Sequence, residues 1–341
     1  MIILVINCGS SSIKYQLFDM KNDDEYSVLA KGILEKIGLP DTKLKHKPTG
    51  KEGFSRISPI ADHKLGMQVV METLIDPVYG VLKSFDDIQA VGHRIVQGAD
   101  FFDKSVLVDD DVLEKIGICC DFAPLHNPAH LLGIAAVKEV LPKVPQIVTF
   151  DTAFHQTMEP KAYMYALPYE YYEKYHVRRY GAHGTSHLFV SQKGAQFAGI
   201  DINNSRIITC HIGNGGSLAA VKNGKCIDTT MGLTPLEGIM MGTRSGDVDG
   251  GAITYLEKKL NLTPDEMSNY LNKKSGVQGI FGVSSDMRDL EAACAAGEKR
   301  AVLAQNMYNY KIKKYIGAFA AAMGGIDIIV FTAGVGENQP S

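Results

Sequence analysis

Three short turns built from small and polar residues give the chain a means of binding phosphate. They span residues 7–12, 213–217 and 333–338, and each follows an apolar run rich in β-branched residues. A turn of this kind exposes consecutive backbone N–H groups, which together bind an anionic phosphate. One such turn is more often structural, but three, two of which resemble each other, favour a phosphate-binding site. The sequence contains neither G-x-x-x-x-G-K-[ST] nor G-x-G-x-x-G, which argues against a P-loop NTPase and a dinucleotide-binding dehydrogenase.

Two arginines stand where a plain surface charge is not expected. Arg94 follows a short apolar run, and Arg244 lies in a loop of small residues, 242–251. The guanidinium fork binds a carboxylate or a phosphate in a bidentate manner. A structural ion pair explains Arg94 about as well, and Asp247 or Asp249 is a candidate partner for Arg244. The sequence alone leaves both interpretations open.

An acid and a histidine add to the candidate chemistry. Asp151 follows the strand-like run 148–150. Acids at the carboxyl ends of strands in α/β folds often face a ligand, so Asp151 either positions a metal-bound water or a nucleophile, or caps the next segment. His183 and His187 have the spacing of two metal ligands on one helix, but Gly184 lies between them and no third ligand has a recognisable spacing. Zinc is therefore disfavoured, and a hydrogen bond from His183 to a developing phosphoryl charge is the better hypothesis.

The elements that must position these residues occur twice. Residues 2–6 and 13–18 predict a strand–turn–strand unit, and residues 207–212 and 218–221 predict a second one, followed by an Asn-Gly hairpin leading into 225–228. INCGSSSIKYQ and HIGNGGSLAAV align without gaps, with Ser12 on Ser217. This weak internal repeat indicates two related domains, for which we expect the bounds 1–150 and 151–341.

Helices are predicted between and after the hairpins, which gives an α/β fold. Asn127 and Pro128 fit an N-cap and a first-turn proline, and Thr263 begins a capping box. A helix that includes residues 308–323 is expected to end at two glycines, followed by a buried strand over 327–332 and a glycine-rich turn over 333–338. Arg94 and Asp151 would thus follow strands, and Arg244 would lie in a loop.

Composition excludes several classes of protein. The 35 Lys+Arg and 38 Asp+Glu residues give a net charge of −3, and 45% of the residues are apolar. This balance excludes a disordered chain and argues against a nucleic-acid partner. The N-terminus has no basic region before its short apolar run, and the most apolar long stretch, 318–336, contains an acid and two adjacent glycines, so we expect neither a signal peptide nor a membrane span. The six cysteines form no C-x-x-C pair, as expected of free thiols in the cytoplasm.

Taken together, the motifs resemble those of the acetokinase family of short-chain acyl kinases. The matching segments run in order over the whole chain: NCGSSSIKY, GHRIVQGAD, APLHNP, FDTAFH, YGAHGTSH, HIGNGGS, TMGLTPLEGIMMGTRSGDVD, SSDMRD and FTAGVGEN. The resemblance implies duplicated actin-like ATPase (ribonuclease H-like) domains flanking a cleft. It also implies a cytoplasmic homodimer that transfers phosphate reversibly between ATP and acetate, with Mg²⁺, and gives acetyl phosphate.

The resemblance also implies a role for particular residues. For the reacting groups it implies Asn7 as a Mg²⁺ ligand, Lys14 at the nucleotide, Arg94 at the carboxylate, Asp151 as organiser of the metal and the reacting groups, and His183 with Arg244 at the transferring phosphoryl group. For the nucleotide it implies His211, Ile212, Gly213, Asn214 and Gly215 at the phosphates, and Asp286, Met287, Arg288, Gly334, Val335, Gly336, Glu337 and Asn338 at the nucleoside. For the acyl group it implies Val96, Leu125, Ala182 and Pro235.

Two departures from the family pattern qualify these expectations. Family members usually have phenylalanine at the position of Ala182, so the acyl pocket is expected to be wider and propionate to compete with acetate. Family members also continue for several dozen residues beyond the position of Ser341, so we expect a truncated chain whose activity is uncertain. The alternatives are therefore a propionate or butyrate kinase of the same fold, and an actin-like nucleotide switch without small-molecule transfer.

Overall fold

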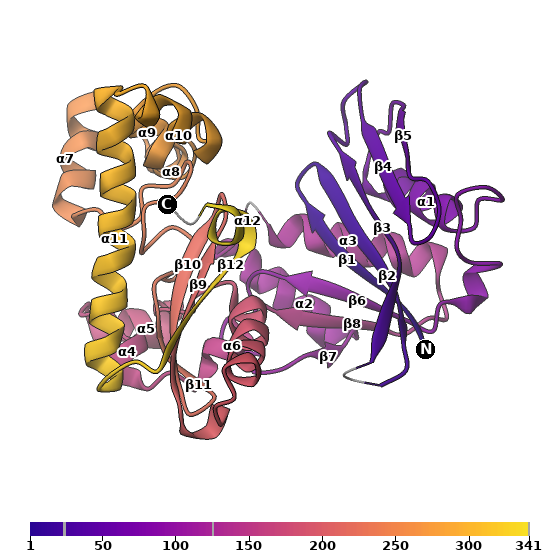
Figure 1. Ribbon diagram of the computed structural model, residues 1–341, viewed down its shortest axis with the longest axis horizontal. Coiled ribbons are helices and arrows are strands. Elements are labelled where there is room, and N and C mark those ends of the chain that lie inside the picture. The colour runs from indigo at the N-terminus through magenta and orange to yellow at the C-terminus, as the bar shows by residue number, and fades with distance from the viewer. Residues whose placement is uncertain (23–24, 125, 340–341) are drawn as a thin grey trace. The chain divides into compact units, whose positions relative to one another are not determined.

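The computed structural model describes residues 1–22, 25–124 and 126–339 and divides the chain into two compact units (Figure 1). Unit 1 is Met1–Ala153, and unit 2 is Phe154–Ser341. Figure 1 draws unit 1 in indigo to magenta, and unit 2 in the colours from magenta to yellow. Because each unit has a sheet and a hydrophobic core of its own, each is described separately.

Unit 1 is built on one mixed sheet with helices packed against it. Its strands are β1 (Ile2–Gly9), β2 (Ser12–Met20), β3 (Tyr26–Glu35), β4 (Lys43–Pro48), β5 (Phe54–Ile57), β6 (Ala90–Ile95), β7 (Val106–Leu107) and β8 (Gln146–Phe150). Its helices are α1 (His63–Leu74), η1 (Phe85–Asp87), α2 (Asp110–Ile118), η2 (Cys119–Asp121) and α3 (Asn127–Val140), and η3 (Ala153–Thr157) crosses into unit 2. The strand order is β5-β4-β3-β2-β1-β6-β8-β7, and β1, β6 and β8 run parallel.

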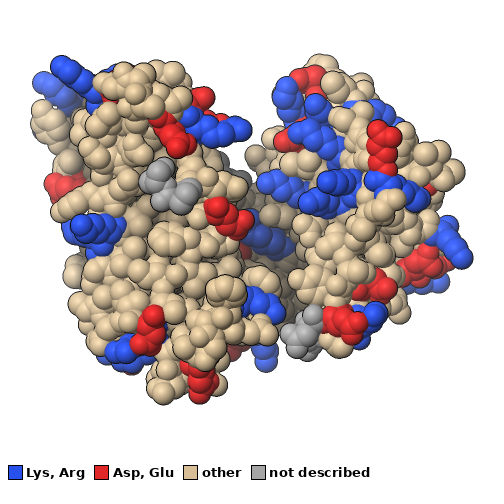
Figure 2. All heavy atoms as spheres, in the orientation of Figure 1, with Lys and Arg blue, Asp and Glu red and all other residues tan. Residues whose placement is uncertain are grey.

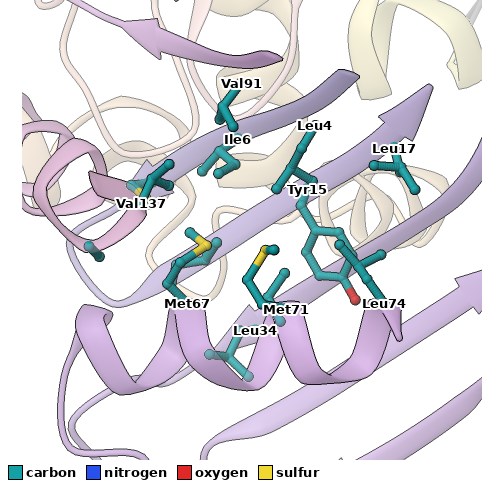
Figure 3. Close-up of a cluster of buried hydrophobic side chains, with 14 of the residues drawn as sticks. Leu4, Ile6, Tyr15, Leu17, Leu34, Met67, Met71, Leu74, Val91 and Val137 are labelled. Atoms are coloured by element: carbon teal, nitrogen blue, oxygen red, sulfur yellow. The ribbon is translucent and has the colours of Figure 1, made fainter. Parts of the chain in front are cut away.

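Alternation along the strands builds the core of unit 1 on one face of this sheet (Figure 3). In β1 and β2 every second side chain is buried, including Leu4, Ile6 and Leu17. Met67 and Met71 on α1 pack against the same cluster. Asp62 begins α1 as its N-cap, because its side chain accepts a hydrogen bond from the backbone N–H of Leu65. This packing fixes the ends of β1, β6 and β8, where candidate site residues lie.

Unit 2 is built on a four-stranded sheet. Its strands are β9 (Arg206–Ile212), β10 (Gly216–Lys222), β11 (Lys225–Thr229) and β12 (Ile328–Thr332). Its helices are α4 (Pro160–Tyr163), α5 (Tyr169–Tyr175), α6 (Gly184–Ala198), η4 (Ile202–Asn204), α7 (Gly250–Leu260), α8 (Pro264–Lys273), α9 (Gly276–Phe281), α10 (Met287–Ala295), α11 (Lys299–Met323) and α12 (Ala333–Asn338). The strand order is β11-β10-β9-β12.

Two helices cover opposite faces of this second sheet. Phe319 and Met323 of α11 pack with Ile208 and Leu218, whereas α6 contributes Ala195 to a separate cluster on alternate strand residues. The predicted capping box at α8 and the predicted end of α11 at Gly324 are both confirmed. The sheet therefore holds its hairpin turn rigidly between two helical layers.

The predicted internal repeat is confirmed as topology but not residue by residue. β1 pairs antiparallel with β2 and parallel with β6, and β9 pairs in the same way with β10 and β12. The first hairpin closes at Gly9 and Ser12, with two residues in its turn, whereas the second closes at Ile212 and Gly216, with three. The gapless alignment is therefore wrong at the turns, because the second turn needs an extra residue to form its Gly213 N–H to Gly215 C=O hydrogen bond.

Three predicted details differ from the structure. Asn127 is the first residue of α3 rather than its N-cap, which is His126, because the Asn127 side chain bonds a loop instead. β12 is not buried, since Ile329 and Phe331 are 39% and 50% exposed, as befits an edge strand. Residues 333–338 form the short helix α12 rather than a turn, and its Glu337 carboxylate accepts hydrogen bonds from the Ala333 N–H and from the hydroxyl of the N-cap Thr332.

Two expectations about the chain's surroundings can be set against the structure. None of the helices among the described residues combines the length and apolar character needed to cross a bilayer. All six cysteines are free, and four of them are buried. The predicted free thiols are therefore confirmed, and the four buried ones contribute to packing.

Candidate active site

Arg94 and Asp151 form a tight ion pair in unit 1. They lie at the carboxyl ends of the neighbouring parallel strands β6 and β8, and the Asp151 N–H donates to the Ile95 C=O at 2.8 Å. Arg94 Nε donates to both Asp151 oxygens at 3.1 Å, and Arg94 Nη2 donates to Oδ2 at 2.6 Å. The Asp151 side chain is 1% exposed and that of Arg94 is 34% exposed. The Asp151 carboxylate raises the pKa of Arg94 above its usual value. Asp151 accepts hydrogen bonds from Nε and Nη2 of the guanidinium and none from Nη1.

The loop after β6 is held by α3 and by the residue that follows Asp151. Asn127 Oδ1 accepts from the Gln97 N–H at 3.2 Å, and Asn127 Nδ2 donates to the Gln97 C=O at 2.8 Å. Thr152 Oγ1 accepts from the Gly98 N–H at 3.1 Å. Val96, 4% exposed, lies in this loop. Buried polar groups are thus satisfied around the Arg94 pair, which makes it rigid.

Two histidines beside this pair stay neutral. Burial lowers the pKa of His93 to about 4, and His93 Nε2 donates to Gln146 Oε1 at 2.7 Å. Burial, followed by the charge of Arg94, lowers the pKa of His130 to about 3. Neither ring adds positive charge at neutral pH. The charges around this ion pair are therefore those of Arg94 and Asp151, which are opposite and cancel.

Asn7 and Lys14 face each other across the first hairpin, where they are register partners of β1 and β2. Both line a hollow of about 580 Å³ whose walls include Lys31, Lys45 and Lys47. Figure 2 shows Lys and Arg side chains gathered on the visible face of unit 1. This basic hollow suits an anion. Leu125, predicted for the acyl pocket, lies outside the described residues.

In unit 2, His183 occupies a strained position at the start of α6. Its φ of +59° is left-handed, and it is the N-cap of the helix. A non-glycine residue in this region costs free energy and is commonly found at functional sites. Its ring stacks on that of His211, with centroids 4.1 Å apart, and Ser186 Oγ lies 2.9 Å from His211 Nδ1. The backbone therefore aims the imidazole rather than leaving it to rotate.

A buried hydroxyl cluster supports His183. Ser217 Oγ lies 2.8 Å from His183 Nδ1, 2.8 Å from His187 Nε2, and 2.9 Å from the carbonyl oxygen of Ala182. Thr209 Oγ1 lies 2.7 Å from His187 Nδ1. Burial, and then the charges of the neighbouring histidines, lower the pKa of His187 well below its usual value. His187 is thus a neutral structural neighbour of His183.

Arg244 lies in a loop that is strapped to the start of α9. The Ser275 N–H donates to the Thr243 C=O, and the Val277 N–H donates to the Met241 C=O. A side chain on Gly276 would come within 2.2 Å of the Met241 oxygen, so the close approach requires glycine. Asp247, a candidate partner of Arg244, is instead hydrogen-bonded by the Gly238 N–H and the Tyr315 hydroxyl.

The surroundings of Arg244 contain little to balance its charge. Its Nη1 donates to the Pro235 C=O at 2.9 Å, and no carboxylate among the described residues pairs with it. Burial lowers the pKa of Arg244 below its usual value. A Cβ built on Gly215 would lie 3.5 Å from Arg244 Nη1 and 3.9 Å from His183 Nε2. Arg244, His183 and the hairpin turn therefore converge on one place, to which an anion is attracted.

Two adjoining cavities lie beyond this hairpin turn. One, of about 670 Å³, is lined by Gly213, Asn214, Gly242, Ser285, Asp286, Met287, Arg288, Glu291, Tyr308, Gly334, Val335, Asn338 and Gln339. The other, of about 660 Å³, is more apolar, and its walls include Ile212, Ile316, Phe331 and Gly336. Met287, Glu291, Tyr308, Val335 and Gln339 line both. Arg288 holds the pKa of Asp286 at about 2, so Asp286 is ionised.

The structure sorts the predicted residues into three groups. Arg94, Val96 and Asp151 lie together in unit 1, with Asn7 and Lys14 at the first hairpin. His183, Gly215, Pro235 and Arg244 lie together in unit 2, with His211 stacked on His183, and the third group lines the cavities. Ala182 is 4% exposed within the main core cluster of unit 2, and Glu337 caps α12.

Sequence reasoning missed Ser217, Thr209 and Asn127 as supports of these groups. Ser217 and Thr209 are both 0% exposed. The signal was a hydroxyl in the middle of an otherwise apolar strand run, which must find a hydrogen-bond partner when buried. The partners themselves are remote in sequence and were not visible in it.

The donor set fits a magnesium ion carried mainly by phosphate oxygens. Mg²⁺ prefers oxygen ligands and usually keeps several waters, so that one or two protein ligands suffice. Asn7 offers an amide oxygen, whereas the Asp151 carboxylate is buried and bonded by Arg94, and no group of three His, Cys, Asp or Glu side chains within residues 1–22, 25–124 and 126–339 forms a metal site. A fully protein-bound transition metal does not fit those residues.

Comparison with known proteins identifies relatives over the whole described length. The sequence model of the Acetokinase family matches residues 2–341. Acetate kinase of Bacteroides thetaiotaomicron is 60% identical over 337 residues, which is 99% of this chain and 84% of that protein. The crystal structure of Porphyromonas gingivalis acetate kinase aligns with a TM-score of 0.93 at 50% identity, over 99% of this chain and 84% of that one. A propionate kinase from Francisella tularensis aligns with a TM-score of 0.92 at 40% identity, over 99% and 85%.

Proposed function

The chain belongs to the acetokinase family, and from this premise we propose that it transfers the γ-phosphoryl group of ATP to acetate and gives acetyl phosphate, reversibly. The observation that carries the proposal is Arg244: a guanidinium whose pKa burial lowers, with one backbone carbonyl as hydrogen-bond partner, beside His183 and the hairpin turn. Such an arrangement stabilises negative charge that develops during transfer. Relatives at 55–60% identity are acetate kinases, which favours acetate over the longer acids and over a nucleotide switch.

The chemistry asks the protein to bring two anions together. A carboxylate has a pKa of about 4, so acetate is already a nucleophile at neutral pH and needs no strong base. We assign acetate to the unused Nη1 end of Arg94, whose other edge Asp151 holds. Asp151 keeps the guanidinium in one orientation, and the neutral His130 beside it adds no competing charge. Val96 lies in the same loop and is assigned to the methyl group.

The nucleotide is assigned to unit 2. The cavity that contains Gly213, Asn214 and Arg288 would hold the nucleoside and its inner phosphates, and the three-residue turn would present backbone N–H groups to the phosphates. Arg244 and His183 would then bind the equatorial oxygens of the transferring group, where charge accumulates. A divalent metal, which we propose is Mg²⁺ held in part by Asn7, neutralises phosphate charge when bound. Lys14, on the same hairpin as Asn7, would add a further positive charge.

We also propose a homodimer, on the family resemblance. A cytoplasmic location is proposed on the family resemblance and on the free cysteines. Size-exclusion chromatography with light scattering measures the first, and a mass of twice 37.1 kDa is expected. A mass equal to one chain at micromolar concentration would contradict it.

A coupled assay of ADP release, with acetate, propionate and butyrate in parallel, tests the proposed activity. Acetate is expected to give the highest kcat/KM, and hydroxylamine is expected to trap acetyl phosphate as the hydroxamate. Because a hydrophobic pocket separates acids that differ by one methylene by only about 1–3 kcal/mol, propionate is expected to react more slowly but measurably. ADP release that does not depend on any acid would favour a nucleotide switch.

A further inference from the structure

We propose that an ion pair within unit 2, Arg179 with Glu237, positions the carbonyl of Pro235 and, through it, the guanidinium of Arg244. Arg179 and Glu237 are then positioning residues, because each acts through Pro235 rather than on the phosphoryl group itself. That Arg244 acts in transfer rests on the proposed function, whereas the coupling of the ion pair to Arg244 rests on hydrogen bonds of the structure.

The link between the ion pair and Arg244 is the Pro235 carbonyl. Arg244 Nη1 donates to this oxygen at 2.9 Å, and it is the one hydrogen-bond acceptor of the Arg244 side chain among the described residues. An arginine side chain has many rotamers, so its guanidinium keeps one orientation only where hydrogen bonds hold it. The orientation of Arg244 therefore depends on where the loop after β11 places the Pro235 carbonyl.

The Glu237 carboxylate holds this loop just after Pro235. Arg179 Nη2 donates to Glu237 Oε1 at 2.6 Å, and the Tyr165 hydroxyl donates to Oε2. The same Tyr165 oxygen accepts from the Leu233 N–H at 3.0 Å, two residues before Pro235. One carboxylate and one hydroxyl thus tie the two sides of the loop together, with Pro235 between them.

Arg179 connects the loop to the end of β11. Its Nη1 donates to the carbonyl oxygens of Thr229, Thr230 and Met231 at 3.0, 3.0 and 3.1 Å. β11 ends at Thr229 and pairs with β10, the strand that follows the hairpin turn. The planar guanidinium serves these carbonyls and the Glu237 carboxylate at the same time, which a lysine ammonium, without that fork, does not. The loop is thereby fixed to the sheet.

The loop is packed closely around the ion pair. A Cβ built on Gly232 would come within 2.0 Å of Glu237 Oε2 and within 2.3 Å of the Tyr165 oxygen, so the approach requires glycine. The side chains of Arg179 and Glu237 are 16% and 32% exposed. This partial burial preserves more of their attraction than full exposure to water would. A change in the ion pair is therefore expected to move the loop.

The direct test is NMR of the arginine side chains, with ¹⁵N-arginine in the chain and no substrates present. The Arg244 signals are assigned by their loss in Arg244→Lys. A hydrogen-bonded guanidinium rotates slowly about its Cζ–N bonds, so Arg244 is expected to give separate Nη–H signals in the original chain and merged ones in Glu237→Ala. Identical Arg244 signals in the two proteins would overturn the proposal. Because no activity is measured, a failure of the proposed function would leave this result standing.

Kinetics then test the consequence for transfer. Glu237→Ala is expected to lower kcat by about 10²-fold, as a displacement of about 1 Å at the reacting groups does. KM for ATP is expected to change little, because the cavity assigned to the nucleotide is lined by other residues. Glu237→Gln keeps an oxygen that accepts from Arg179, so it should restore part of kcat and the separate Arg244 signals. No recovery in Glu237→Gln would contradict a role in positioning.

Asp327→Ala is the matched control. Asp327 pairs with Arg206 at the start of β9, the end away from the hairpin turn, and its side chain is also 32% exposed. This variant is expected to lower the free energy of unfolding but to keep kcat and the Arg244 signals. Equal falls in kcat in both alanine variants would indicate a general loss of packing and overturn the proposal. If Glu237→Ala fails to fold, Tyr165→Phe, which removes one of the two donors to Glu237, takes its place with the same expected result.

Discussion

Units 1 and 2 each carry one predicted arginine, and the two arginines have opposite electrostatic surroundings. Arg94 shares two of its nitrogens with the buried Asp151, which raises its pKa. Among the described residues Arg244 has one backbone carbonyl as hydrogen-bond partner, and burial lowers its pKa. A compensated guanidinium is rigid and orients a ligand, whereas an uncompensated one attracts charge. With the roles proposed above, Arg94 is expected to contribute chiefly to the stability of unit 1 and to acetate binding, and Arg244 chiefly to phosphoryl transfer.

The largest expected effect comes from removing the uncompensated charge. Arg244→Ala should lower kcat by about 10³-fold or more, because an arginine that stabilises a transferring phosphoryl group contributes on that order. The melting temperature of Arg244→Ala should stay close to that of the original chain. The variant loses one hydrogen bond, but it also no longer has to bury a charged group. Steady-state ADP release and a thermal melt measure both quantities, with Arg56→Ala, an exposed arginine of β5, as control. Activity within tenfold of the original would erase the distinction between the two arginines.

Removing the compensated charge should have the opposite profile. Arg94→Ala leaves the Asp151 carboxylate buried without its partner, and breaking a buried pair costs about 3–5 kcal/mol, with the lower end expected here because Arg94 is one-third exposed. The free energy of unfolding, from urea titration, should fall accordingly, and KM for acetate should rise.

A matched double variant sharpens this second prediction. Arg94→Ala with Asp151→Asn removes the orphaned charge, so it should recover part of the lost stability without recovering acetate affinity. Equal stability losses in the Arg94→Ala and Arg244→Ala variants would show that the two surroundings do not differ energetically.

Acid should lower the free energy of unfolding of unit 1, because buried histidines there are held neutral. Burial holds the pKa of His93 at about 4, below the ~6.5 of an exposed histidine. Between these values the unfolded chain binds a proton that the folded chain does not, so stability is fully present above pH ~6.5 and is lost as pH falls toward 4. His93→Gln removes the group that binds this proton in the unfolded chain. The drop in unfolding free energy between pH 7.5 and 5 should therefore be about 2 kcal/mol smaller in the variant. The same drop in both proteins would place His93 in contact with water.

The smallest expected effect concerns the length of the acid. Ala182→Phe should lower kcat/KM for propionate relative to acetate by about tenfold, within the ~1–3 kcal/mol that one methylene contributes. A fall in stability of about 1–3 kcal/mol should accompany it, because Ala182 is buried and the larger ring overfills its site. Val96→Ala is the matched change in unit 1. A propionate-to-acetate ratio that responds to Val96→Ala alone would assign chain-length selection to unit 1.

Much of the framework was accessible from the sequence, because its signals are local. The hairpins at residues 9–12 and 212–216, the capping box at Thr263 and the end of α11 at Gly324 each depend on a few adjacent residues. The extra residue in the second turn was missed, because both hairpins have the same apolar pattern on either side of the turn. That pattern does not reveal how many residues the turn contains. The exposure of Phe331 was missed because apolar composition does not reveal which strand lies at a sheet edge.

The site was accessible in part, and the limit was again distance along the chain. Arg94 and Asp151 were singled out separately, but 57 residues separate them, and only the parallel pairing of β6 and β8 brings them together. For Arg244 the sequence left open a bound anion or a pair with Asp247 or Asp249, and the fold assigns Asp247 to Gly238 and Tyr315. Ser217 was a polar residue in a buried strand, and its role became visible only when three partners converged on it.

Phosphorus NMR of the chain mixed with ATP, Mg²⁺ and acetate, compared with the Arg244→Ala variant under the same conditions, tests the proposed role of Arg244 most directly. The original chain is expected to produce an acetyl phosphate signal together with ADP, and the variant, folded and able to bind nucleotide, is expected to produce none in the same time. An acetyl phosphate signal that grows equally fast in the variant would contradict the role of the uncompensated arginine, and its absence from the original chain would contradict the proposed activity itself.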